Sequence, residues 1–188
     1  MNITVVGAGV VGCAVAYELA SRGARVEMID PRGPGRGATG ASAGILAPLI
    51  EGHSEELLRL GTCSLALWDD FVRRVQAESG LTIAYERSGT LQVALDEAQA
   101  SELLDLGRRL ESAGVQHALL DGRGATTLEP GLTNRATRAL LVPQHGFVGP
   151  MSLIDALVRA ATIRGVSIVQ ARATNIDEIR TDAIIIAA

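Results

Sequence analysis

Aromatic residues are scarce in this chain: they make up 3% of its 188 residues, whereas hydrophobic residues as a whole make up 47%. The core therefore has to be aliphatic, and the chain is long enough for one, since a domain of this size buries about two thirds of its unfolded surface. An excess of positive charge is also missing, because the formal net charge is −4. Nucleic acids are held by basic patches, so the composition argues against a nucleic-acid partner.

Long apolar runs and cysteine clusters are lacking as well. No run approaches the roughly 18 apolar residues of a membrane span, and no basic stretch precedes an apolar run as in a signal peptide. Cys13 and Cys63 lie in helical contexts without CxxC or CxxH spacing. We expect both to be reduced and buried, and the sequence predicts a cytoplasmic protein without a membrane span.

The chain begins with a strand, a helix and a second strand. Ile3 to Val6 is a β-branched run typical of a strand buried in a parallel sheet. Val10 to Arg22 repeats with a helical period and is stopped by Gly23, and Arg25 to Ile29 reads as the next strand. This order predicts one βαβ unit.

The rest of the pattern predicts that this α/β domain is interrupted. A long helix is expected from Ser54 to Glu78, and its buried side would carry Leu57, Leu60, Leu65, Trp68, Phe71 and Val75. Short strands and helices follow, and the α/β pattern returns with a helix at 153–164 and strands at 167–170 and 183–186. We predict a doubly wound Rossmann-like α/β domain made of 1–80 and 147–188, with an incomplete α+β unit inserted at 81–146.

The first strand leads into a glycine-rich turn, Gly7-Ala8-Gly9-Val10-Val11-Gly12. Gly7 permits a tight turn, Gly9 lets a pyrophosphate approach the backbone, and Gly12 lets the helix pack closely on the strand. Free N–H groups at the helix start favour the phosphates. Because a strand precedes the turn and a helix follows it, we predict a dinucleotide site, with a turn that binds no ligand as the alternative.

Asp30 ends the second strand, at the spacing of a carboxylate that accepts hydrogen bonds from ribose hydroxyls. Its negative charge argues against a 2′-phosphate there. Arg36 lies beside the proposed phosphate loop, and both a phosphate contact and a solvated position remain open for it.

A second segment completes a family pattern. It reads Gly37-Ala38-Thr39-Gly40-Ala41-Ser42-Ala43-Gly44-Ile45-Leu46-Ala47-Pro48. Together with the turn and Asp30 it resembles the FAD-dependent D-amino-acid oxidase superfamily, and within it the glycine oxidase branch of thiamine biosynthesis. Two further segments support the resemblance, Gly89-Thr90-Leu91 and Gly146-Phe147-Val148-Gly149-Pro150. It covers nearly the whole chain but only the N-terminal half of a family member.

The resemblance implies that FAD is the cofactor and that 81–146 is part of a substrate domain. It places Asp30 where the family has glutamate, small residues along the diphosphate and flavin ring, and one residue near the adenine. The implied FAD-binding residues are Gly7, Gly9, Val10, Val11, Gly12, Asp30, Pro31, Ala38, Thr39, Ala43, Gly44, Ile45 and Ala173.

The resemblance also implies a reaction, the oxidative deamination of glycine or another small amino acid or amine. A hydride passes to the flavin, the imine is hydrolysed, and oxygen or another acceptor takes the electrons. The arginine and tyrosine that hold the substrate in the family have no counterpart in this chain, so no catalytic residue is expected in it. We expect a truncated enzyme, and the alternatives are a non-catalytic remnant and a nucleotide-binding subunit that needs a partner chain.

A nicotinamide-dependent dehydrogenase is a weaker alternative, because such an enzyme does not need the small residues from Ala38 to Gly44. The strand at 183–186 would lack a neighbour, which predicts homo-oligomers or association with a missing half. His53, His117 and His145 are too scattered for a metal site, and we expect exposed or loop positions for them.

Overall fold

The computed structural model describes residues 1–50 and 54–188. They form two units: Met1–Gly44, Trp68–Tyr85 and Val148–Ala188 make the first, and Ile45–Leu67 and Glu86–Phe147 make the second. The division at residues 81 and 147 that the sequence suggests stays a prediction. His53 lies outside the described residues.

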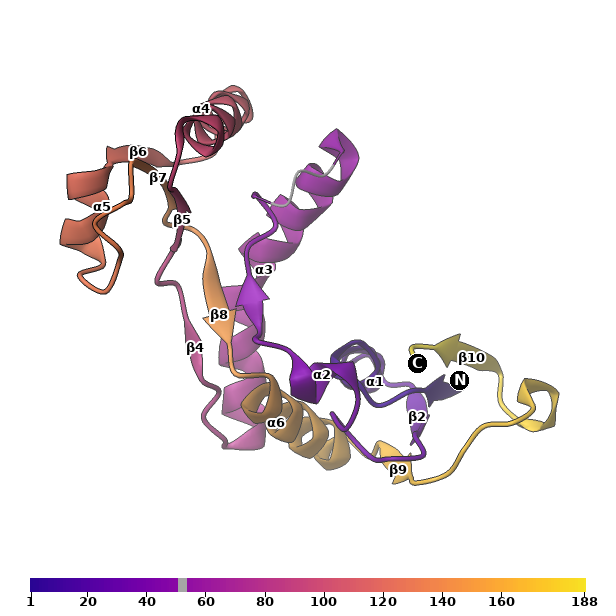
Figure 1. The fold of residues 1–188 in the computed structure, drawn as a ribbon. Helices are drawn as coiled ribbons and strands as arrows, with labels where there is room; N and C mark the ends of the chain where they lie inside the picture. The colour runs from indigo at the N-terminus through magenta and orange to yellow at the C-terminus, as the bar shows by residue number, and fades with distance from the viewer. Residues whose placement is uncertain (51–53) are drawn as a thin grey trace. The chain divides into compact units, whose positions relative to one another are not determined.

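The first unit is built on a four-stranded parallel sheet in the order β10-β1-β2-β9, with β1 at Asn2–Val6, β2 at Arg25–Ile29, β9 at Ser167–Val169 and β10 at Ala183–Ile186. Numbered by their order in the chain and read from β9 to β10, the four strands have the order 3-2-1-4. This order is the beginning of the Rossmann strand order. Figure 1 shows β10 and both termini together at this sheet. The order reverses between β1 and β10, so a switch point lies at the carboxyl end of β1.

One face of this sheet carries the core. Ile3 pairs with Val26 and Val5 with Met28 in register, and all four side chains are buried. Helix α1 (Val10–Ser21) packs against β1, β2 and α6 (Pro150–Ile163). Tyr17 is the only aromatic residue among the buried hydrophobic residues described, so the predicted aliphatic core is confirmed.

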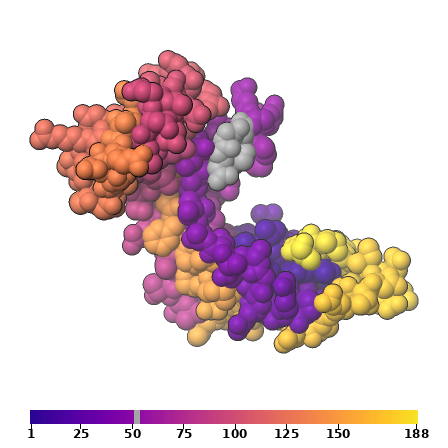
Figure 2. Space-filling view, viewed as in Figure 1, coloured from indigo at the N-terminus to yellow at the C-terminus, as the bar shows by residue number. Residues whose placement is uncertain are grey.

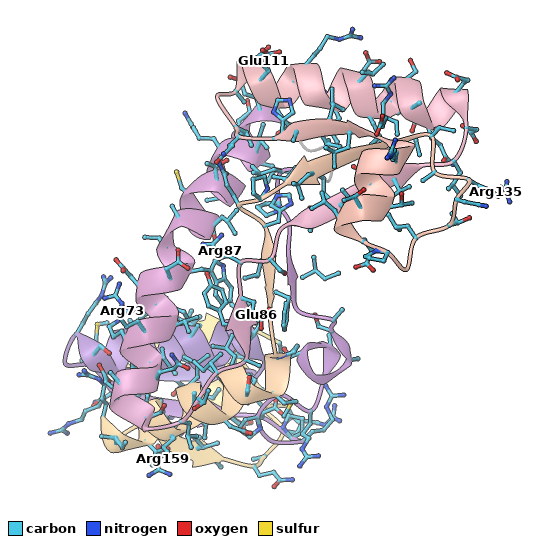
Figure 3. All side chains as sticks on the ribbon, turned by 90° about the vertical axis from the view of Figure 1, so that its left-hand side faces the viewer. Arg73, Glu86, Arg87, Glu111, Arg135 and Arg159 are labelled. Atoms are coloured by element: carbon cyan, nitrogen blue, oxygen red, sulfur yellow. The ribbon has the colours of Figure 1, made fainter. Side chains whose placement is uncertain are left out.

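Helix α3 (Glu55–Ser79) contributes its last turns to the first unit. Arg164, the residue that follows α6, donates two hydrogen bonds of 2.6 Å to the carboxylate of Glu78, and Arg74 forms an ion pair with Glu18 of α1. These contacts connect α3 to both neighbouring helices. Figure 3 shows Arg73 on α3 and Arg159 on α6 pointing away from their helices.

The buried side of α3 differs from the expected one. Leu65 and Val75 are buried, whereas Leu57 and Leu60 are 50% and 66% exposed. Trp68 is half-buried, and its ring stacks on Tyr85 at 6.2 Å. The apolar stripe continues to the start of the helix, but no described residue covers Leu57 and Leu60 enough to bury them.

The second unit contains an antiparallel sheet in the order β5-β7-β6, formed by Thr90–Ala94, Arg138–Val142 and Ala118–Asp121. Helix α4 (Glu97–Ser112) packs on this sheet with Leu103, Leu106 and Leu110, and α5 (Gly122–Leu128) follows β6. Strand β3 (Ile45–Leu46) pairs with β8 (Gly146–Val148), which also neighbours β4 (Tyr85–Glu86). A helix long and apolar enough to cross a membrane is not found in the described ranges.

Candidate functional site

The glycine-rich turn leaves the sheet at the switch point. Gly7 has a φ of 106°, and its N–H donates to the carbonyl of Ile29 over 2.8 Å. A Cβ atom at this position would lie 2.5 Å from the carbonyl oxygen of Ala187. Both the left-handed backbone and the close approach of the chain after β10 therefore require glycine.

Gly12 is where α1 packs on the turn. A Cβ atom there would lie 1.9 Å from the carbonyl oxygen of Gly7 and 3.5 Å from a methyl group of Val5. No side chain fits such a gap. The close helix–strand packing expected from the sequence is thus present in the backbone geometry.

Gly9 begins α1 without a side-chain cap. Its carbonyl accepts the N–H of Cys13 over 2.9 Å, the first backbone bond of the helix, so the preceding first-turn N–H groups have no acceptor inside the helix. Val10 is half-buried and Val11 is 61% exposed. This helix start has the partial positive charge and the open backbone that a diphosphate needs.

Thr39 reaches this helix start from a second segment. Its Oγ1 accepts the N–H of Val10 over 3.0 Å, and it belongs to a short helix, α2 (Ala38–Ala41). The small residues of this segment allow a tight helical turn. A Cβ atom on Gly40 would lie only 2.6 Å from the carbonyl oxygen of Gly35.

Asp30 already accepts three backbone hydrogen bonds. Its Oδ2 accepts the N–H of Ala8 over 3.0 Å, and its Oδ1 accepts those of Arg32 and Gly33 over 2.8 and 3.0 Å. Burial raises the pKa of this carboxyl, but the three N–H donors and the charge of Arg32 outweigh that effect and hold the pKa below its usual value. The group is a carboxylate at neutral pH.

The segment predicted to pass the flavin ring contains another required glycine. Gly44 has a φ of 70°, its carbonyl accepts the N–H of Val148 over 2.9 Å, and a Cβ atom would lie 1.9 Å from the carbonyl oxygen of Val148. Ala43 is exposed, and Ile45, which belongs to the second unit, is 64% exposed.

The remaining predicted residues lie farther along the first unit. Pro31 is exposed, and its carbonyl accepts a 3.4 Å hydrogen bond from Gln170. Ala173 is half-exposed in irregular chain between β9 and the short 3₁₀ helix Ile176–Glu178. Arg36 is exposed. Hydrogen bonds thus bring together the turn, Asp30 and Thr39, and no hydrogen bond among the described residues joins Ala173 to that group.

Two residues of the site escaped the sequence interpretation. Ala8 donates its N–H to Asp30, and its carbonyl accepts the N–H of Gly35 over 2.8 Å. Gly35 is buried with a φ of 70°. No pattern in the sequence identified Ala8 as the partner of Gly35.

One expectation for cysteine is wrong, and one for histidine holds in an unexpected way. His145 lies in a loop, as expected, but it is fully buried: its Nε2 accepts the N–H of Leu49 over 3.3 Å, and its Nδ1 lies 2.7 Å from Oγ1 of Thr90. Those two partners satisfy the ring, which explains how a turn histidine can be buried. Cys13 is buried as expected, but Cys63 is exposed. The described residues contain no group of three or more potential ligands that could hold a metal ion.

The sheet order and the turn at its switch point define a dinucleotide-binding protein of the Rossmann type. Residues 2–188 match the family described as FAD dependent oxidoreductase (DAO). The chain belongs to this family, whose cofactor is FAD, and the resemblance noted from the sequence is confirmed.

Individual relatives agree with this assignment. The chain is 29% identical over 184 residues to glycine oxidase of Geobacillus kaustophilus, a match that covers 97% of this chain and 48% of that protein. It is 36% identical over 160 residues to ThiO of Rhizobium etli, a protein assigned by name to thiamine biosynthesis, with 84% of this chain and 45% of that protein covered. The chain spans about half the length of the curated relatives it matches.

Solved structures show the same fold. The crystal structure of glycine oxidase from Geobacillus kaustophilus superposes with a TM-score of 0.91 at 26% identity, over 99% of this chain and 54% of that chain. The structure of iminodiacetate oxidase from Chelativorans sp. BNC1 superposes with a TM-score of 0.83 at 26% identity. This match covers 98% of this chain and 54% of that chain. The predicted Rossmann-like α/β fold is confirmed, whereas the inserted substrate domain and the FAD contacts of single residues stay predictions.

Proposed function

We propose that this chain holds FAD at the carboxyl end of β1, for the oxidation of a small amino acid or amine. The observation that carries the proposal is the start of α1 at the sheet's switch point, where Gly9 has no side chain and the N–H groups of Val11 and Gly12 have no acceptor inside the helix. In open α/β sheets, ligands bind outside the carboxyl ends of the strands at such a point.

The residues around this point fit the diphosphate part of the cofactor. Gly9 offers backbone without a side chain, and the first turn of α1 offers N–H groups. We assign the diphosphate to Gly7, Gly9, Val10, Val11, Gly12, Ala38 and Thr39, the ribose and adenine side to Asp30, Pro31 and Ala173, and the flavin side to Ala43, Gly44 and Ile45. The likeness to the glycine oxidase group supports this assignment.

FAD would accept a hydride from the carbon that bears the amine, and the imine would then be hydrolysed. The relatives named glycine oxidase and iminodiacetate oxidase support a small amino acid or amine as substrate, and oxygen or another acceptor would take the electrons. The chain's own part is to bind and orient the cofactor. We keep 81–146 as the proposed part of a substrate domain, and a partner chain or second copy as the proposed source of further substrate contacts.

The test begins with the visible spectrum and FAD titration of the purified chain. Flavin bands near one equivalent support the proposal, and a folded protein that takes up no FAD contradicts it. Gly9→Val is a suitable variant for this test, because the φ of −72° and ψ of −176° suit any residue and the added side chain would occupy the approach of the diphosphate. Its Cβ atom would lie 3.2 Å from Oγ1 of Thr39, so circular dichroism has to show that the variant is folded. Peroxide release with glycine or sarcosine tests catalysis, and FAD binding without turnover supports the subunit alternative.

A further inference from the structure

The carboxylate of Asp30 is engaged by the protein itself. Oδ2 accepts one backbone N–H, from Ala8, and Oδ1 accepts two, from Arg32 and Gly33, all within 3.0 Å. These donors come from the turn before α1 and from the chain after β2. The side chain therefore bridges two segments that are 22 or more residues apart in sequence.

Ala8 is held from both sides. Its N–H points to Asp30, while its carbonyl accepts the N–H of Gly35 over 2.8 Å and lies 3.4 Å from the thiol of Cys13. Gly35 itself is enclosed, because a Cβ atom there would lie 3.2 Å from Met151 and from Ile154 of α6. The orientation of the peptide groups that lead into Gly9 and α1 is fixed by these contacts.

Asp30 is negatively charged, and so is the diphosphate that the neighbouring turn is proposed to bind. A carboxylate near a diphosphate repels it, so simple electrostatics predicts that its removal strengthens phosphate binding. A benefit to phosphate binding has to come from the geometry that the carboxylate imposes on the N–H groups around it.

We propose that Asp30 is a positioning residue for the diphosphate, because it fixes Ala8 and so aims the N–H groups of the turn and of α1. This role is additional to any contact with the ribose, and it rests on the proposed binding of FAD. The two roles differ in the ligand that they affect: a ribose contact concerns only ligands with a ribose, whereas positioning of the turn also concerns inorganic pyrophosphate.

The experiment compares FAD and inorganic pyrophosphate by isothermal titration with wild type, Asp30→Ala, Asp30→Asn and Asp30→Glu. If Asp30 positions the turn, Asp30→Ala should weaken the binding of both FAD and pyrophosphate by about tenfold or more, although the substitution removes a negative charge. Asp30→Asn keeps one acceptor for Arg32 and Gly33 and should fall between wild type and Asp30→Ala. Asp30→Glu keeps both acceptors and should restore pyrophosphate binding to within about threefold of wild type.

A matched control lies at the other end of the sheet. Asp182 also accepts a backbone N–H, that of Asn2 over 2.7 Å, but it precedes β10 and is remote from the turn. Asp182→Ala should leave pyrophosphate binding unchanged. Unchanged or tighter pyrophosphate binding by Asp30→Ala, together with weaker FAD binding, would overturn the proposal in favour of a ribose contact alone.

Amide hydrogen exchange of the cofactor-free protein separates this proposal from the proposed function. Asp30→Ala should speed exchange of the Ala8, Arg32 and Gly33 amides by about tenfold or more, while Val26 and Met28 in β2 stay protected. If wild type binds neither FAD nor pyrophosphate, the proposed function fails, and the exchange rates still decide whether Asp30 orders the turn. Unchanged exchange at all three amides contradicts the proposal.

Discussion

The hydroxyl oxygen of Thr39 accepts the N–H of Val10 over 3.0 Å and so connects α2 to the first turn of α1. The two residues are 29 positions apart in the sequence. The oxygen accepts this one N–H, and among the described residues no acceptor is recorded for the hydroxyl proton.

Thr39→Val removes this acceptor and keeps the shape of the side chain. We expect about 1 kcal/mol less stability, because the N–H of Val10 loses its partner, and roughly tenfold weaker FAD binding. Urea unfolding and FAD fluorescence titration measure the two effects. Thr39→Ser keeps the hydroxyl and should resemble wild type, so equal losses in both variants would argue against the hydrogen bond.

Gly12→Ala should destabilise the protein strongly. The new methyl group would meet the carbonyl oxygen of Gly7 at 1.9 Å, and relief of such overlap typically costs about 1–3 kcal/mol or more. Gly131→Ala is the control, since its methyl group would meet only the flexible carboxylate of Glu129 at 3.1 Å. Thermal unfolding of the two variants should differ clearly, and similar midpoints would contradict the packing argument.

The two cysteines should differ in reactivity. Cys63 is exposed, whereas burial and the charge of Asp30 raise the pKa of Cys13 to about 12. Because the thiolate is the reactive form, a thiol reagent should modify one cysteine in the native protein and both after unfolding. Cys63→Ser should abolish the native reaction, and rapid modification that persists in this variant would show that Cys13 is accessible.

His145 should make stability depend on pH. Burial, with the positive charge of Arg87 as a second cause, lowers its pKa from 6.5 to about 4. Arg87 directly follows β4, and its guanidinium donates to the carbonyls of Gln144 and Leu65. The unfolded chain binds the proton more tightly than the folded one, so this contribution is complete above pH 6.5 and is lost as the pH falls towards 4.

The neutral His145 contributes about 3 kcal/mol to the free energy of unfolding above pH 6.5. Denaturant unfolding between neutral pH and the acid end of this range measures it, with His145→Gln as comparison. The glutamine can accept the N–H of Leu49 but does not titrate, so the variant should lose less stability than wild type on acidification. Parallel pH profiles of the two proteins would contradict the assignment.

Self-association should involve the edge strand β10. Ile186 is 60% exposed, and Figure 2 shows the C-terminal residues, in yellow, uncovered at the surface. An apolar edge strand favours pairing with another chain. We expect concentration-dependent oligomers in sedimentation velocity and their reduction by Ile186→Lys, and a wild type that stays monomeric at all concentrations would refute this expectation.

Much of the first unit could be predicted from sequence, because its signals are local. The glycine spacing around Gly7 and Gly12 specifies the turn, and the period of Val10 to Arg22 specifies the helix that follows. The return of the chain to the sheet at Ala183 could also be foreseen, since a β-branched run after a helix is typical of a further parallel strand.

The parts that failed depend on distant neighbours. Strands β3 and β8 have two and three residues, too few for a periodic pattern. They form because β3 pairs with β8, which also neighbours β4. The burial of His145 requires Leu49 and Thr90, and the exposure of Cys63 depends on what packs against α3. The three N–H donors around Asp30 follow from loop geometry that no residue pattern encodes.

The pairing of β1 with β10 has a consequence for the order of folding. Ile3 lies opposite Ala183, so the central strand β1 completes its ladder with β10 only after 180 further positions have been synthesised. Contacts of such long range close slowly, and the exposed strand is vulnerable to wrong pairing meanwhile. We infer that α1 and β2 shelter the nascent strand β1 early. Pairing with β10, after which Ala187 encloses Gly7, is then a late step that makes the glycine-rich turn rigid.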